Sequence, residues 1–119
     1  VIFCIGETIS EKRKKMTKKI LNRQIKRGLK NINKKNKILI AYEPVWAIGS
    51  GLIPKQKDLF ETIDFIKKRV KPLRVLYGGS VNPKNIKELK KIKNLDGFLV
   101  GGASQNSKKF IDIIRKTYN

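Results

Sequence analysis

The sequence contains no histidine and only one cysteine, Cys4, among its 119 residues. Catalytic triads that use an imidazole base and histidine-ligated zinc sites are therefore excluded. A single cysteine also excludes an internal disulfide and a Cys-x-x-Cys metal site, which fits a reducing, cytoplasmic setting. Cys4 stands in an apolar run, so we expect a buried and inert thiol rather than a nucleophile.

Long apolar runs are missing as well. No stretch approaches the roughly 18 apolar residues that span a membrane, so no membrane association is expected. No charged and then apolar leader opens the sequence, so nothing suggests secretion. Apolar residues still make up 39% of the chain, which is enough for a small core. We expect one domain over residues 1–119, because no linker or low-complexity segment divides the sequence.

Acidic residues are scarce, since 9 Asp and Glu stand against 29 Lys and Arg, which gives a net charge of +20. Such a balance is typical of proteins that bind nucleic acid. Most of the excess is lysine, however, and lysine, isoleucine and asparagine dominate the sequence together, as an AT-rich genome would produce. The basic residues are also spread along several segments. We favour compositional drift, and keep a non-catalytic basic module that binds nucleic acid or another polyanion as the alternative.

Short apolar runs alternate with longer amphipathic segments along the chain. Buried strands are expected at residues 1–5, 38–42, 74–77 and 97–100. Helices are expected at 10–29 with Ser10 as the cap, from Pro54 to Pro72, after the pair Asn82-Pro83, and around Phe110. Apolar strands alternating with helices predict an α/β fold with a parallel sheet. Active sites of such folds lie in the loops that follow the strands.

Glycine-containing turns follow three of the four predicted strands. They are Gly49-Ser-Gly51, Gly78-Gly-Ser80 and Gly101-Gly102. Any one of them alone is more often a tight turn than a binding site. Three turns at equivalent points of successive units favour a site where backbone N–H groups bind a phosphate.

Glu43 is the only acidic residue in the strand and loop that cover residues 38–54. It stands beside Tyr42, Val45 and Trp46, so its carboxylate is expected to be partly desolvated. Partial desolvation favours a general base with a raised pKa. A strand-end acid paired with one of the many lysines is the alternative.

Four segments of the chain form a longer pattern. Residues 41–51 read Ala-Tyr-Glu-Pro-Val-Trp-Ala-Ile-Gly-Ser-Gly. Residues 4–7 read Cys-Ile-Gly-Glu, residues 77–83 Tyr-Gly-Gly-Ser-Val-Asn-Pro, and residues 96–104 Asp-Gly-Phe-Leu-Val-Gly-Gly-Ala-Ser. In this order and spacing they resemble the triosephosphate isomerase family. The resemblance covers essentially the whole chain, and it implies the C-terminal half of a (β/α)8 TIM barrel, that is, its last four strand-helix units.

The resemblance also implies roles for single residues. It implies that Glu43 is the catalytic base. It implies that the substrate phosphate is bound by Gly49, Ser80, Gly101 and Gly102. It implies a mobile lid whose function depends on Trp46, Tyr77 and Glu7, with Glu7 as the partner of Trp46 and Tyr77 as a latch. The lid's far hinge, Gly51-Leu-Ile-Pro54, is shorter than the common family form, which leaves the partner of Tyr77 open.

The family interconverts dihydroxyacetone phosphate and D-glyceraldehyde 3-phosphate in glycolysis and gluconeogenesis, in the cytoplasm and as a homodimer. The resemblance implies proton transfer by Glu43 through an enediolate, with no metal and no cofactor. The family's first half carries an electrophilic histidine and a substrate-positioning asparagine and lysine. These have no equivalent among the 119 residues. We therefore expect a fragment that is nearly inactive alone, with a first-half chain as a candidate partner.

Overall fold

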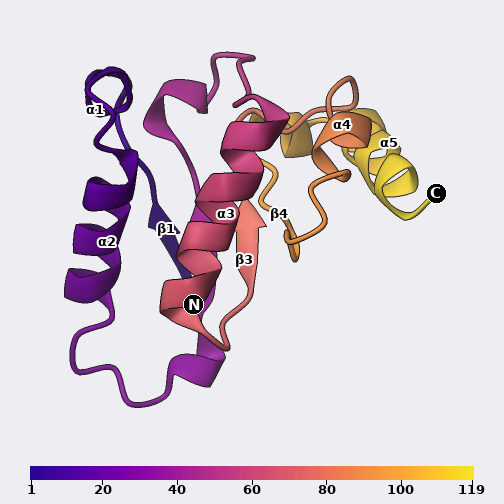
Figure 1. Ribbon diagram of the computed structural model, residues 1–119. Helices are drawn as coiled ribbons and strands as arrows, with labels where there is room; N and C mark the ends of the chain where they lie inside the picture. The colour runs from indigo at the N-terminus through magenta and orange to yellow at the C-terminus, as the bar shows by residue number, and fades with distance from the viewer.

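The computed structural model describes residues 1–119 as a parallel sheet of four strands with helices packed along it (Figure 1). The strands are Ile2–Ile5 (β1), Leu39–Tyr42 (β2), Val75–Tyr77 (β3) and Gly97–Phe98 (β4), and their order in the sheet is that of the chain. The helices are Ile9–Arg13 (α1), Thr17–Gly28 (α2), Gln56–Val70 (α3), Ile86–Leu89 (α4) and Ser107–Tyr118 (α5). The predicted parallel α/β fold is confirmed, and the open sheet fits a partial (β/α)8 barrel.

The register of the strands decides which side chains face the helices. Ile5, Tyr42 and Tyr77 are aligned across β1, β2 and β3, and all three are buried in the core. Side chains alternate between the faces of a strand, so Cys4 and Leu76 belong to the opposite face. The core packed under α2 and α3 lies on the other face, and Cys4 is exposed. The prediction of a buried Cys4 is therefore wrong.

The core lies between the sheet and its helices, and α2 and α3 run side by side along the strands (Figure 1). Leu21 and Ile25 of α2, and Leu59, Ile63 and Ile66 of α3, are all buried. Their three- and four-residue spacing puts them on one helical face, as the sequence predicts. None of the helices combines the length and the apolar character that crossing a membrane requires.

The helix predicted over residues 10–29 is interrupted. Thr8, not Ser10, caps α1, because its side chain accepts from the Glu11 N–H while the Glu11 carboxylate accepts from the Thr8 N–H. The chain then turns at Lys15, whose φ is 57°. Helix α1 is only five residues long and has no buried residue, so little packing supports its continuation into α2.

Three further boundaries differ from the prediction. Helix α3 begins after Lys55 rather than at Pro54. Asn82 caps a turn rather than a helix, since its Oδ1 accepts from the N–H groups of Lys84 and Asn85, and α4 begins only at Ile86. Strand β4 covers only Gly97–Phe98 of the predicted 97–100, although the Leu99 N–H still donates to the carbonyl of Tyr77 at 2.9 Å.

Candidate active site

Glu43 follows β2 directly, and its place is fixed by the neighbouring strands. Its N–H donates to the carbonyl of Ile5 at 2.8 Å. Strand alternation turns its side chain to the same face as Cys4, away from α2 and α3. A Cβ at Gly78 would lie 2.7 Å from Glu43 Oε1, so only glycine at position 78 leaves room for this carboxylate.

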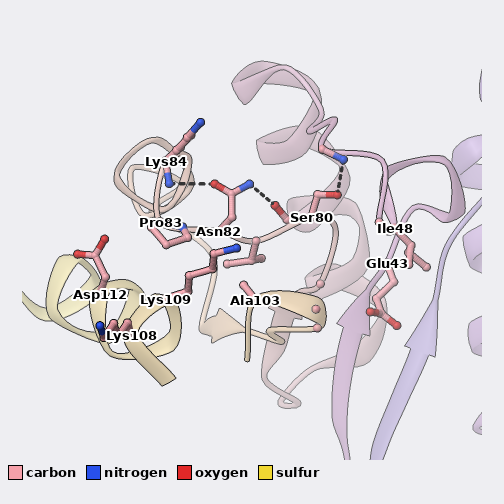
Figure 2. A pocket seen from close by; sticks show the side chains of 16 residues that line it. Glu43, Ile48, Ser80, Asn82, Pro83, Lys84, Ala103, Lys108, Lys109 and Asp112 are labelled. Atoms are coloured by element: carbon pink, nitrogen blue, oxygen red, sulfur yellow. Dashed lines mark hydrogen bonds between the residues drawn. The ribbon is translucent and has the colours of Figure 1, made fainter. Parts of the chain in front are cut away.

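One cavity of about 840 Å³ contains most of the predicted site (Figure 2). Its lining includes Glu43 together with all four predicted phosphate-binding residues, which are Gly49, Ser80, Gly101 and Gly102. These residues come from the loops after β2, β3 and β4. The structure therefore brings one carboxylate and three glycine-containing loops to the same end of the sheet.

The backbone is unusual at three points, which are Ser80 and two glycines in the loop after β2. That loop, residues 44–54, is the predicted lid and is called the lid segment below. The φ angles of Gly49 and Gly51 are 65° and 77°, and Ser80, which is not glycine, has a φ of 49°. Nothing lies within 4 Å of a Cβ built on Gly49 or Gly51. Glycine is therefore required at these positions by the left-handed backbone and not by lack of space.

Ser80 connects the loop after β3 to the lid. Its Oγ accepts from the Gly51 N–H at 3.0 Å (Figure 2). The same Oγ donates to the carbonyl of Ala47 in a short contact. Its own carbonyl accepts from the side-chain amides of Asn82 and Asn85, at 3.1 and 2.8 Å. One hydroxyl thus holds both sides of the lid segment against the sheet.

The carboxylate of Glu7 forms a buried group on the helix side of the sheet, with only 1% of the residue exposed. It accepts from the Tyr42 hydroxyl at 3.1 and 3.2 Å and from Trp46 Nε1 at 3.1 Å. Burial, and then the negative charge of Glu7, raise the pKa of Tyr42. The ammonium of Lys12 lies 4.4 Å from the centre of the Trp46 ring. Trp46 and Glu7 are therefore in contact, as the sequence predicts.

Tyr77 lies beneath the loop after β2, and its role as a latch stays a prediction. Its hydroxyl is buried and has no hydrogen-bond partner, and burial followed by the charge of Glu7 raises its pKa. The Gly51 N–H donates to Ser80, and the Leu52 N–H donates to Ser50. In this structure the hydrogen bonds between the loops after β2 and β3 therefore come from Ser80.

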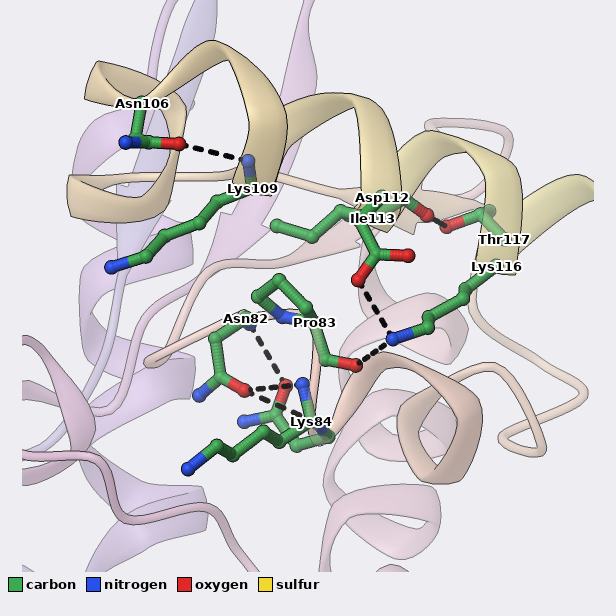
Figure 3. Close-up of polar contacts among 10 residues, drawn as sticks. Asn82, Pro83, Lys84, Asn106, Lys109, Asp112, Ile113, Lys116 and Thr117 are labelled. Carbon is green, nitrogen blue, oxygen red and sulfur yellow. Dashed lines mark hydrogen bonds and ion pairs between the residues drawn. The ribbon is translucent and has the colours of Figure 1, made fainter.

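Helix α5 supplies a wall of the cavity that the sequence did not predict (Figure 3). Lys116 donates to Asp112 at 2.8 Å and to the carbonyl of Pro83 at 3.0 Å, which ties the turn after β3 to α5. Lys84 and Lys109 line the cavity from these two elements. Their positive charges favour an anionic ligand. The only signal in the sequence was the general excess of lysine.

Comparison with known proteins agrees with this geometry. A family model described as triosephosphate isomerase matches residues 1–117. The chain belongs to the triosephosphate isomerase family. The triosephosphate isomerase of Thermodesulfovibrio yellowstonii is 44% identical, with 97% of this chain and 50% of the relative aligned. That of Mycoplasma mobile is 44% identical, with 96% and 48% aligned, and that of Candida albicans is 44% identical, with 97% and 50% aligned. The chain spans about half the length of these curated relatives.

Cys4 is exposed on the sheet, and it adjoins Glu43. Partial desolvation, a hydrogen bond to Glu43 and the negative charge of Glu43 together raise the pKa of Cys4 from 9.0 to about 11. A raised pKa keeps the thiol protonated at neutral pH, and the protonated thiol is a poor nucleophile.

Alkylation of Cys4 by iodoacetamide is therefore expected to be slow at pH 8. At this pH the thiolate fraction of Cys4 is roughly 100-fold smaller than that of a cysteine with the ordinary pKa. The rate should rise until the pH passes about 11. Glu43→Gln should speed the reaction at pH 8, because it removes the negative charge. Mass spectrometry of timed samples measures the rate. Equal rates in the parent chain and in Glu43→Gln would contradict the contact between the two side chains.

Proposed function

We propose that this chain supplies the base, the lid and the phosphate-binding loops of a triosephosphate isomerase, which interconverts dihydroxyacetone phosphate and D-glyceraldehyde 3-phosphate. The observation that carries the proposal is the lining of one cavity by Glu43 and by Gly49, Ser80, Gly101 and Gly102. A carboxylate and a set of loop glycines suit a substrate with an acidic C–H bond at one end and a phosphate at the other. Membership of the family adds to this support.

In the proposed reaction the Glu43 carboxylate removes a proton from the carbon beside the substrate carbonyl. The electron pair of the broken C–H bond forms the enediolate, and the protonated Glu43 returns the proton to the neighbouring carbon. The proton of the substrate hydroxyl passes to the former carbonyl oxygen, so that the carbonyl moves to the other carbon. Gly49, Ser80, Gly101 and Gly102 hold the phosphate meanwhile. The lid, with Trp46 at its hinge and Glu7 as the partner of Trp46, excludes water and keeps the enediolate from losing phosphate. No metal or cofactor takes part in these steps.

The proposal assigns polarisation of the substrate carbonyl to residues outside this chain. No histidine is present among the 119 residues, and in the family the electrophilic histidine belongs to the first half of the barrel. A first-half polypeptide is thus the proposed partner, and the complete barrel is expected to form a homodimer.

Complementation tests the proposal. The purified chain is assayed alone and after refolding with a polypeptide that carries the first four strand-helix units of a relative. We expect activity near the uncatalysed rate for the chain alone and clear isomerase activity for the mixture. Strong activity of the chain alone would contradict the division of roles. If the two halves co-purify and remain inactive, the proposed function itself is wrong.

Ser80→Ala is expected to lower kcat/KM of the complemented enzyme by roughly 30-fold, since two hydrogen bonds that hold the lid contribute about 1 kcal/mol each. Ser50→Ala is the matched control. Its Oγ accepts only from Leu52 within the lid, so its loss does not detach the lid from the sheet. Steady-state kinetics compare the two variants. Equal losses in both would mean that the Ser80 contact does not hold the lid.

A further inference from the structure

The side chain of Gln24, on α2, binds both polar backbone groups of Gly6. The Gly6 N–H donates to Gln24 Oε1 at 3.0 Å, and Gln24 Nε2 donates to the Gly6 carbonyl at 3.0 Å. The side-chain amide of Gln24 thus donates and accepts at once, as the backbone of a residue in a neighbouring β-strand would. No hydrogen bond links Gln24 to any other residue, so this half-buried side chain serves Gly6 alone.

The residues on either side of Gly6 bind the backbone around Glu43. The carbonyl of Ile5 accepts from the Glu43 N–H at 2.8 Å, and the carbonyl of Glu7 accepts from the Val45 N–H at 2.9 Å. Gly6 is therefore the middle residue of the segment 5–7. Through the carbonyls of Ile5 and Glu7, this segment holds the backbone of Glu43 and Val45 in place. The N–H and carbonyl of Gly6 point the other way, toward α2.

Gly6 also touches the backbone of Glu43 directly. A Cβ built on Gly6 would lie 1.8 Å from the Glu43 carbonyl oxygen and 2.5 Å from its carbonyl carbon. No flexible side chain lies between the two backbones that could absorb a shift. In close-packed surroundings, a displacement of Gly6 is passed on to Glu43.

The same segment controls the lid hinge. Glu7 follows Gly6 and accepts from Trp46 Nε1 at 3.1 Å. A shift of Gly6 therefore moves the acceptor of Trp46 as well as the backbone of Glu43. Trp46 is the only tryptophan in the chain, so its fluorescence reports this movement.

We propose that Gln24 is a positioning residue, which holds Gly6 and thereby sets the place of Glu43 and of the Trp46 hinge. For its kinetic part this inference rests on the proposed function. Gln24 does not touch the substrate, and it acts from the outer helix through a backbone contact.

Gln24→Glu separates hydrogen bonding from packing. Glutamate has the same shape and can still accept from the Gly6 N–H, but it sets an oxygen against the Gly6 carbonyl and offers no donor when ionised. Gln24→Met removes both hydrogen bonds at similar size. Asn22→Asp is the matched control, because it makes the same amide-to-carboxylate change on α2, where Asn22 Oδ1 accepts from Arg69 at 3.2 Å.

In the complemented enzyme, both Gln24 variants are expected to lower kcat by about 10- to 100-fold, with a smaller change in KM, since the base is displaced and the phosphate loops are not. In the chain alone, both should shift the emission of Trp46. Asn22→Asp should leave kcat within about twofold and the emission unchanged. Circular dichroism confirms that each variant folds, and Gln24→Glu decides the matter if Gln24→Met does not fold.

The inference is overturned if Gln24→Glu matches Asn22→Asp in kcat and in Trp46 emission. Glu43→Gln distinguishes this failure from failure of the proposed function. If Glu43→Gln abolishes activity while Gln24→Glu leaves kcat unchanged, only the role of Gln24 is wrong. If Glu43→Gln leaves activity intact, the proposed function is wrong, and an unchanged Trp46 emission in Gln24→Glu would then reject the link to Gln24 as well.

Discussion

Replacing Glu43 by glutamine is expected to lower kcat of the complemented enzyme by about 10²- to 10⁴-fold, the range that a positioned general base contributes. The carboxamide has the shape of the carboxylate and fits the space that Gly78 leaves open. It cannot accept the proton from substrate carbon. KM should change much less, because Ser80, Gly101 and Gly102 still line the cavity.

Glu61→Gln is the matched control for this change, since Glu61 lies exposed on α3, away from the cavity. Its kcat should stay within about twofold of the parent value. Glu43→Asp provides an intermediate case, because it keeps a base but withdraws the carboxylate by one methylene. An unchanged kcat in Glu43→Gln would remove Glu43 from the role of base.

Gly78→Ala is expected to cost about 10²-fold in kcat, although it leaves every functional group in place. The new Cβ would lie 2.6 Å from Glu43 Cγ and 2.7 Å from Oε1, so the carboxylate must move. A misplacement of about 1 Å is enough for a loss of this size. The free energy of unfolding should change little, because the Glu43 side chain is only part buried and can turn away from the new methyl group.

Gly97→Ala, on the neighbouring strand β4, is the control for the glycine substitution. A Cβ there would lie 3.1 Å from the tip of Leu76, which can rotate away. We expect little change in kcat from Gly97→Ala. Urea unfolding and steady-state kinetics, measured on both variants, separate stability from catalysis. If Gly78→Ala keeps the parent kcat, the position of the Glu43 carboxylate is not limiting.

Local patterns were enough to predict the strands and most of the core. The apolar runs at 38–42 and 74–77 contain β2 and β3, because a strand buried between helices and a neighbouring strand needs apolar residues throughout. The spacing of Leu59, Ile63 and Ile66 predicted the buried face of α3. The prediction failed where no apolar pattern exists, as at the turn around Lys15 that separates α1 from α2.

The sequence by itself determined the parallel α/β fold, the likeness to the family, and the residues that line the cavity after β2, β3 and β4. These follow from periodicity and from motifs whose residues are close together in the chain. Only the tertiary structure decided that Cys4 lies exposed beside Glu43, that the Tyr77 hydroxyl has no partner, and that Gln24 holds Gly6. Each of these depends on how segments that are distant in the sequence pack together once the strands are in register. Spacing along the chain does not contain that information, because a hydrogen bond between a helix and a strand end is set by how the two pack.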